Sequence, residues 1–203
     1  MKKLDIKNVL TEGVGIGTKN FVSLVLASIL YCVTVWIPYL NVGTTIAMMS
    51  IPVELSKGNV INPLFIFDAK YRKNMGEFFI LLGLMGMAMV PAYFMGIIPG
   101  IVLNLAWALA IFLFIDQDLR ALEALRKSNE LTYGNKWRMF FVSLIINLAL
   151  MIVICILEAL LGDTTLGNIL LIIVLLLWVP IDLGCNAVIY KQLTTPEEEV
   201  QVE

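Results

Sequence analysis

The sequence contains no histidine, which removes the side chain that most often carries acid–base chemistry or binds a metal near neutral pH. Its three cysteines, at positions 32, 155 and 185, stand alone in apolar runs and form no CxxC pair. A zinc knuckle or a redox-active dithiol is therefore not expected. Walker, GxSxG and HExxH motifs are also missing. These absences predict a protein that is not an enzyme and that uses no cofactor and no metal.

Charge is scarce as well. Only 15% of the 203 residues are charged, 60% are apolar, and the mean hydropathy is +0.89. Soluble domains average about 25% charged residues, so too few polar side chains are present here to coat a soluble fold. The net charge of −2 gives no indication of a nucleic-acid partner. We therefore expect a single integral membrane domain over residues 1–203.

Long runs without charge locate the expected membrane spans. A spanning helix needs about 20 apolar residues. The uncharged run 20–53 is too long for one helix and carries the turn formers Pro38, Asn41 and Gly43 at its middle. The two later apolar runs are each long enough for two spans. The prediction is an all-α, polytopic membrane protein with six transmembrane helices, near residues 20–38, 40–56, 75–92, 98–116, 138–161 and 167–190.

The positive charges predict the orientation of these spans. All fourteen Lys and Arg residues fall within 2–19, 57–73 and 120–138 or at position 191. Cytoplasmic loops collect Lys and Arg. Six spans place every one of these cations on one side, whereas a single long first helix would put two basic loops on opposite sides. We therefore expect both termini in the cytoplasm and short external turns.

Two segments outside the spans have the apolar periodicity of amphipathic helices. The apolar side of the first, residues 5–17, consists of Ile6, Val9, Leu10, Val14 and Ile16. The apolar arc of the second, residues 118–133, consists of Ala121, Leu122, Ala124, Leu125 and Ser128. Both are expected on the cytoplasmic side. They either recruit a partner at the membrane surface or only cover the inner ends of the spans, and we favour the second interpretation.

Polar side chains inside spans are the default candidates for a functional site. Asn147 and Glu158 share one face of the fifth expected span, Asp182 and Asn186 share one face of the sixth, and Asn104 lies in the fourth. They form either a polar path for a cation, a proton or a lipid headgroup, or hydrogen bonds that hold helices together. Asn147 and Asp182 lie equally far from the basic ends of their spans, so we expect them to pair.

Two motifs between residues 97 and 140 resemble known families. The chain reads IPGI at 98–101 and then AL..S..L..G..W..F from Ala124 to Phe140. Both resemble bacterial six-helix membrane families of unknown function: the domain of unknown function nine-seven-five, the YciC-like inner-membrane proteins, and the membrane domain fused to some glycerophosphodiester phosphodiesterases. The resemblance implies six helices in a bacterial inner membrane. The soluble catalytic domain of the phosphodiesterases has no counterpart in these residues, so their activity is not carried over.

Two functions fit these observations. The leading hypothesis is a non-enzymatic integral inner-membrane protein that binds or scaffolds a membrane or cytoplasmic partner, with membrane lipid, a membrane protein or a second copy of the chain as partners. The alternative is a small transporter or lipid-handling protein that uses its intramembrane Asp, Glu and Asn residues. A stoichiometric protein partner retained in mild detergent would favour the first, and a tightly held lipid or ion the second.

Overall fold

The computed structural model describes residues 3–162 and 164–195, which are helical throughout apart from turns and loops. The all-α prediction is confirmed. In chain order the elements are α1 (Ile6–Lys19), α2 (Phe21–Thr34), α3 (Leu40–Ser56), the short 3-10 helices η1 (Pro63–Phe67) and η2 (Ala69–Arg72), α4 (Met75–Met95), α5 (Ile97–Trp107), α6 (Ala110–Gln117), α7 (Ala121–Thr132), α8 (Lys136–Leu161) and α9 (Thr165–Thr194).

Four stretches of the described chain are long and apolar enough to cross a membrane: α4, α5 together with α6, α8 and α9. A fifth is added if α1 and α2, which meet at an angle of 75°, count as one bent span. The membrane character is thus confirmed with four to five candidate spans. The segment predicted to cross at 40–56 is α3, whose 17 residues extend only about 26 Å. This falls short of the roughly 30 Å hydrocarbon core.

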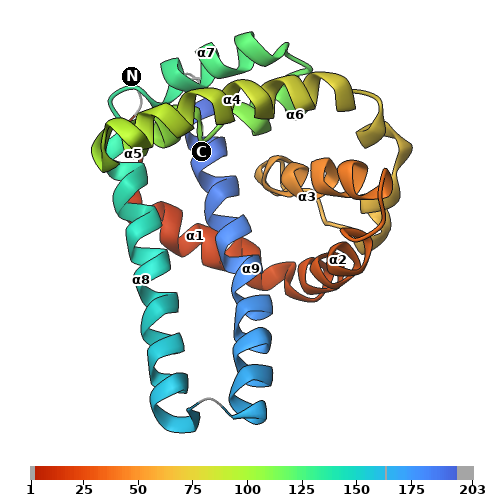
Figure 1. Cartoon of the computed structure of the whole chain (residues 1–203), viewed down its shortest axis with the longest axis vertical. Helices are drawn as coiled ribbons and strands as arrows, with labels where there is room; N and C mark the ends of the chain where they lie inside the picture. The colour runs from red at the N-terminus through yellow and green to blue at the C-terminus, as the bar shows by residue number, and fades with distance from the viewer. Residues whose placement is uncertain (1–2, 163, 196–203) are drawn as a thin grey trace.

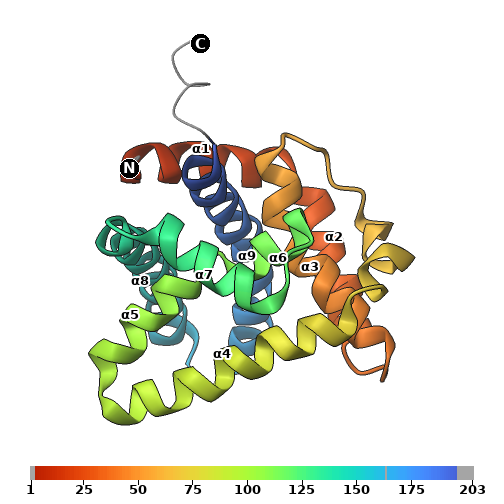
Figure 2. The same ribbon diagram turned by 90° about the horizontal axis from the view of Figure 1, so that it is seen from above.

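The long helices do not form one parallel bundle. α8 and α9 pack against each other and project from the rest of the molecule as a hairpin, while α4 runs across the opposite end at a steep angle to both (Figure 1). From above, α4 and α5 form a V that lies beside the ends of these two helices (Figure 2). The chain therefore has a projecting hairpin and a broader helical body at one end of it.

The C-terminal half of α9 is the centre of the body. α1, α2 and α3 all pack on it. Its buried side consists of Pro180, Gly184, Cys185, Ala187, Val188, Ile189, Tyr190 and Leu193. The other half of the same helix lies in the hairpin and exposes large apolar side chains: Leu166, Ile169, Ile172, Ile173, Leu175 and Leu177.

α1 crosses α9 where both helices lack bulk. A Cβ atom on Gly184 would lie 2.1 Å from the carbonyl oxygen of Gly13, and one on Gly17 would lie 2.4 Å from the carbonyl oxygen of Pro180. Small residues allow helix backbones to approach this closely. The predicted N-terminal amphipathic helix is confirmed as a helix. Its contact face is different, however, because the glycines are buried while Val14, expected on the apolar side, is 40% exposed.

The second predicted amphipathic helix is α7, which supplies hydrogen-bond partners for the backbone where the chain breaks between α5 and α6. The fourth expected span is interrupted at Ala108 and Leu109. The fully buried Ser128 of α7 donates a hydrogen bond to the carbonyl oxygen of Ala106 at 2.8 Å and accepts one from the N–H of Leu109 at 3.2 Å. Backbone groups freed in apolar surroundings need such partners. Leu122, predicted on the same arc, is instead 58% exposed.

Candidate functional site

Three of the five predicted site residues, Asn147, Asp182 and Asn186, make hydrogen bonds within their own helices. Asn147 donates from Nδ2 to the carbonyl oxygen of Ser143 at 2.8 Å and to its hydroxyl oxygen at 3.2 Å. Asp182 accepts a hydrogen bond at 3.1 Å from Asn186, which lies one turn further along α9. The structure therefore replaces the predicted pairing of Asn147 with Asp182 by two local contacts, because a neighbour one helical turn away satisfies each group.

The two remaining candidates lie elsewhere. Glu158 lines a small hollow of about 320 Å³ at the tip of the hairpin, together with Gly162, Gly167 and Asn168. Asn104 is exposed on α5. The five predicted residues are thus spread over α5, the middle of α8, the tip of the hairpin and the half of α9 that lies in the body. Within residues 3–162 and 164–195 they do not converge on one site.

One end of the molecule gathers segments that are far apart in the chain. The N–H of Leu4 donates to Oδ1 of Asn135 at 2.8 Å, and the carbonyl oxygen of Leu4 accepts from Arg138 at 2.7 Å. At the end of α9, Lys191 forms an ion pair of 3.2 Å with Glu12 of α1. The N-terminal segment, the start of α8 and the end of α9 therefore lie together, opposite the tip of the hairpin.

A carboxylate at the end of α6 joins three helices, and the sequence analysis did not single it out. Asp116 accepts hydrogen bonds from Nζ of Lys57, which caps α3, and from the hydroxyl of Tyr190 on α9. Only 15% of the Asp116 side chain is exposed. Its one signal in the sequence is its position as the carboxylate that closes a long apolar run. With two donors already bound, it is a structural contact between helix ends.

An apolar groove of about 460 Å³ lies between α5 and α8. Pockets that hold small ligands have volumes of roughly 300–1,000 Å³. α5 lines the groove with Ile98, Ile101, Val102 and Leu105. α8 and the turn before it contribute Tyr133, Gly134, Lys136, Trp137 and Phe140. The sequence alone does not reveal this groove, because its two walls come from separate segments, although each wall overlaps one of the two motifs that carry the family resemblance.

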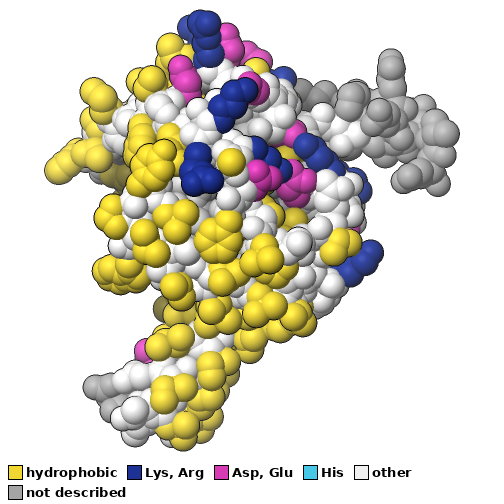
Figure 3. Space-filling view, turned by 90° about the vertical axis from the view of Figure 1, so that its right-hand side faces the viewer, with side chains coloured by type: hydrophobic (Ala, Val, Ile, Leu, Met, Phe, Trp, Pro, Cys, Tyr) yellow, Lys and Arg dark blue, Asp and Glu magenta, His cyan; other side chains and the backbone are white. Residues whose placement is uncertain are grey.

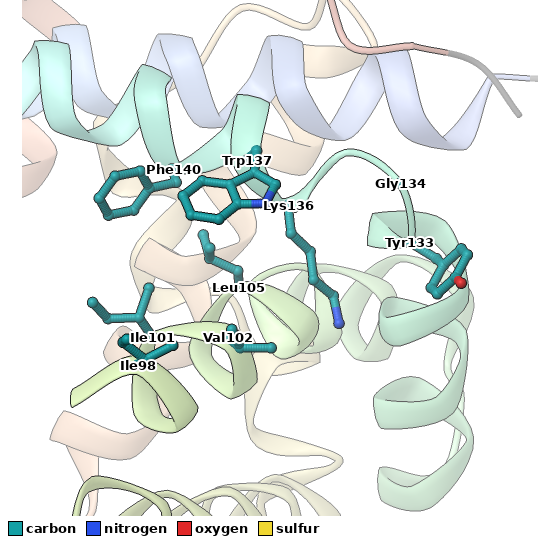
Figure 4. A pocket seen from close by; sticks show the side chains of 9 residues that line it. All are labelled: Ile98, Ile101, Val102, Leu105, Tyr133, Gly134, Lys136, Trp137 and Phe140. Carbon is teal, nitrogen blue, oxygen red and sulfur yellow. The ribbon is translucent and has the colours of Figure 1, made fainter. Parts of the chain in front are cut away.

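The polar groups of the groove gather at one end. Figure 4 shows the ammonium group of Lys136 and the indole nitrogen of Trp137 on one side, and Ile98 and Phe140 on the other. Nζ of Lys136 donates to Oδ1 of Asn129 at 3.1 Å. The Trp137 ring is 74% exposed and packs edge-on against Phe140, with 6.0 Å between ring centroids. The groove is therefore apolar along most of its length and ends in hydrogen-bond donors.

The groove also brings together residues that the predicted topology separates. Ile98 was expected at the external end of the fourth span and Lys136 at the cytoplasmic end of the fifth. Both line the same groove, since α4 and α5 lie across α8 and not along it (Figures 1 and 2). The turn between α4 and α5 therefore lies near the start of α8 and not near the tip of the hairpin (Figure 1).

Comparison with known proteins gives no information on function. A comparison with protein-family models, with curated proteins and with solved structures finds no match for this chain. The resemblance to bacterial six-helix families therefore stays a prediction. Within the described residues, no group of three or more His, Cys, Asp or Glu side chains is placed to hold a metal ion.

Proposed function

We propose that this chain is a non-enzymatic integral membrane protein that scaffolds a protein partner, with the α8–α9 hairpin inserted in the bilayer and the charged end in the cytoplasm. The observation that carries the proposal is the separation of the two kinds of surface. Lys, Arg, Asp and Glu side chains gather toward the end of the body that faces away from the hairpin, whereas apolar side chains cover much of the hairpin and of the adjoining part of the body (Figure 3). The exposed apolar residues of the hairpin include Leu148, Ile152, Leu160, Leu166 and Ile172.

The orientation is part of the proposal. The contacts of Leu4 with Arg138 and of Glu12 with Lys191 hold the two chain ends at the same end of the hairpin. That end carries the basic stretches, and cytoplasmic loops collect Lys and Arg. We therefore propose that both ends of the described chain face the cytoplasm, which is the orientation that the sequence predicts. Placement in a bacterial inner membrane rests on the family resemblance alone.

The proposal requires that α8 and α9 cross the membrane. The sequence predicts six crossings, which include these two. In that topology the turn between α4 and α5 reaches the external side. The groove favours fewer crossings, because it brings Ile98 against the first turns of α8, where Lys136 and Phe140 lie. Labelling of a Met95→Cys variant from outside the cell separates the two topologies, since Met95 is 82% exposed at this turn.

The outer face of α7 is the surface that we assign to the partner. The apolar face of α7 is occupied by α5, α6 and α4 of the same chain. Its outer face exposes both signs of charge, with Glu123, Arg126, Lys127 and Glu130. Mixed charge suits a protein better than a nucleic acid, which attracts a surface of positive sign. The transporter alternative needs polar residues that converge within the membrane, and the structure gives that alternative less support.

Site-specific photo-cross-linking in native membranes tests the proposal. A benzophenone side chain at Arg126, on the outer face of α7, should give a protein adduct of discrete mass. The same group at Leu144, which is 46% exposed on α8, should give none because lipid surrounds it. Absence of an adduct at Arg126 contradicts the scaffold. Labelling of a Leu160→Cys variant from the cytoplasmic side contradicts the insertion of the hairpin.

A further inference from the structure

We infer that the groove between α5 and α8 binds an anionic phospholipid, with an acyl chain along its apolar wall and the phosphate at Lys136. This inference rests on the insertion of α8 in the membrane, as proposed above, but requires no protein partner. It goes beyond a general lipid environment, because it names one site, one end for the headgroup and a preference for negative charge.

The first argument is the chemistry of the polar end. Lys136 carries three N–H donors and no acceptor, and the indole of Trp137 is a donor only. None of the nine residues that line the groove is acidic. A phosphate diester accepts hydrogen bonds and has no donor of its own, so it matches this end. A peptide segment or a second copy of the chain would bring backbone N–H groups, which need acceptors.

The second argument is the shape and position of the groove. Ile98 and Trp137, at its mouth, are 75% and 74% exposed, so the groove opens sideways, toward the region that lipid would occupy. Tryptophan and tyrosine side chains concentrate at the headgroup level of membrane proteins, and Trp137 and Tyr133 lie where α8 begins. From this level, the apolar surface of the hairpin extends away from Lys136. A lipid bound with its phosphate at Lys136 therefore directs its chains into the bilayer.

The third argument concerns the leaflet. In the proposed orientation, the start of α8 lies at the cytoplasmic surface, where anionic lipids concentrate. Lys136 and Arg138 both belong to the first turn of α8, but Arg138 is already bound to the carbonyl oxygen of Leu4. Lys136 donates a hydrogen bond to the uncharged side chain of Asn129. This contact leaves the positive charge of Lys136 available to a phosphate.

Native mass spectrometry of the full-length protein in mild detergent tests the site. Delipidated protein is titrated with phosphatidylglycerol and, separately, with the zwitterionic phosphatidylcholine. Phosphatidylglycerol should bind about fivefold more tightly, the contribution of one lysine at an anionic surface. Lys136→Gln should abolish this preference and Lys136→Arg should retain it, whereas Lys73→Gln, a change at an exposed lysine outside the groove, should leave it unchanged.

Filling the groove tests the acyl-chain wall. Val102→Trp should weaken binding of both lipids by at least about tenfold, the loss expected when two methylene groups are displaced. Val33→Trp is the matched control, because Val33 is also an exposed valine on an apolar helix, α2. If Val102→Trp fails to fold, Ile98→Trp replaces it, since the exposed Ile98 side chain can be enlarged without intruding on the core.

Several results overturn the inference. These are wild-type binding by both groove variants, equal loss in Val33→Trp, a preference for phosphatidylglycerol that survives Lys136→Gln, and a bound species with the mass of a protein or a peptide. The outcome is distinct from that of the scaffold proposal. Cross-linking at Arg126 reports on the protein partner whether or not the groove holds a lipid.

Discussion

The two halves of α9 have opposite surroundings, and the more apolar half is the exposed one. From Pro180 to Leu193 the helix is buried among α1, α2 and α3, whereas from Thr165 to Val179 it exposes most of its large side chains. The buried half contains Gly184, Cys185 and Ala187, and the exposed half is composed mainly of Leu, Ile and Val. In lipid, hydrophobicity does not drive helices together. Small residues that permit close approach therefore distinguish the half that packs against other helices from the half that lipid would surround.

The same difference explains how one helix serves two purposes. The buried half receives α1 at a backbone-to-backbone crossing, where Gly13 and Gly184 meet. Outside its contact with α8, the other half exposes a surface of branched side chains, which lipid covers in the proposed orientation. We therefore expect the first half to determine the stability of the body, and the second, in the proposed orientation, to determine the placement of the chain in the membrane. Substitutions on the two halves should separate these effects.

The largest effect is expected at the crossing. Gly184→Leu places a branched side chain where even a Cβ atom would lie 2.1 Å from the carbonyl oxygen of Gly13. The clash is with backbone, so the cost should exceed the roughly 1–3 kcal/mol of ordinary overpacking. We expect no folded monomer in size-exclusion chromatography of detergent-solubilised protein. Gly15→Leu is the control, because nothing lies within 4 Å of a Cβ atom at Gly15. A Gly184→Leu variant that elutes and melts like the wild type would refute this account of the crossing.

The next effect compares two isoleucines of α9. Ile189 is 7% exposed and Ile172 is 58% exposed. Ile189→Ala should lower the free energy of unfolding by about 2–5 kcal/mol, because it leaves a cavity in the body. Ile172→Ala should change it by less than about 0.5 kcal/mol, as is usual for a surface position. Thermal and denaturant unfolding in detergent measure both. Equal losses at the two positions would mean that the hairpin is packed in solution.

The long helices could be predicted from the sequence because an apolar run bounded by charge is a local property. The spans expected at 138–161 and 167–190 are α8 and α9, with bounds that differ by at most four residues. The span expected at 75–92 is α4, which begins at the same residue. Periodicity also located α1 and α7, although it assigned part of each contact face wrongly.

The arrangement of these helices could not be predicted in the same way, because it depends on contacts between distant residues. No local signal connects Asp116 to Lys57 and Tyr190, and hydropathy does not reveal that α5 lies across α8. The spacing of Gly13 and Gly17 did carry a signal, since two small residues four positions apart favour close helix packing. The pairing of the candidate site residues was the least predictable feature, because a polar residue in a span forms a hydrogen bond within its own helix as readily as with another helix.

A smaller effect is expected where the buried half of α9 meets α6. Tyr190→Phe removes the hydroxyl that donates to Asp116. A hydrogen bond to a charged group contributes about 1.5–3 kcal/mol, and we expect the lower end because Lys57 still binds the carboxylate. The unfolding free energy is the measurement. Tyr39→Phe is the control, since Tyr39 is 74% exposed. No loss in Tyr190→Phe would show that Lys57 alone satisfies Asp116.

The smallest effect is expected at the C-terminal end of the packed half, where Lys191 pairs with Glu12 at 3.2 Å. The two side chains are 53% and 33% exposed, so water and salt screen the pair. A double-mutant cycle with Lys191→Ala and Glu12→Ala should give a coupling of about 0.2–1 kcal/mol, as for other exposed ion pairs. The coupling should fall further in 1 M salt, where the screening length is about 3 Å. A coupling above about 2 kcal/mol that salt leaves unchanged would place the pair in a dry environment. The ion pair, and not the glycine crossing, would then account for much of the attachment of α1 to α9.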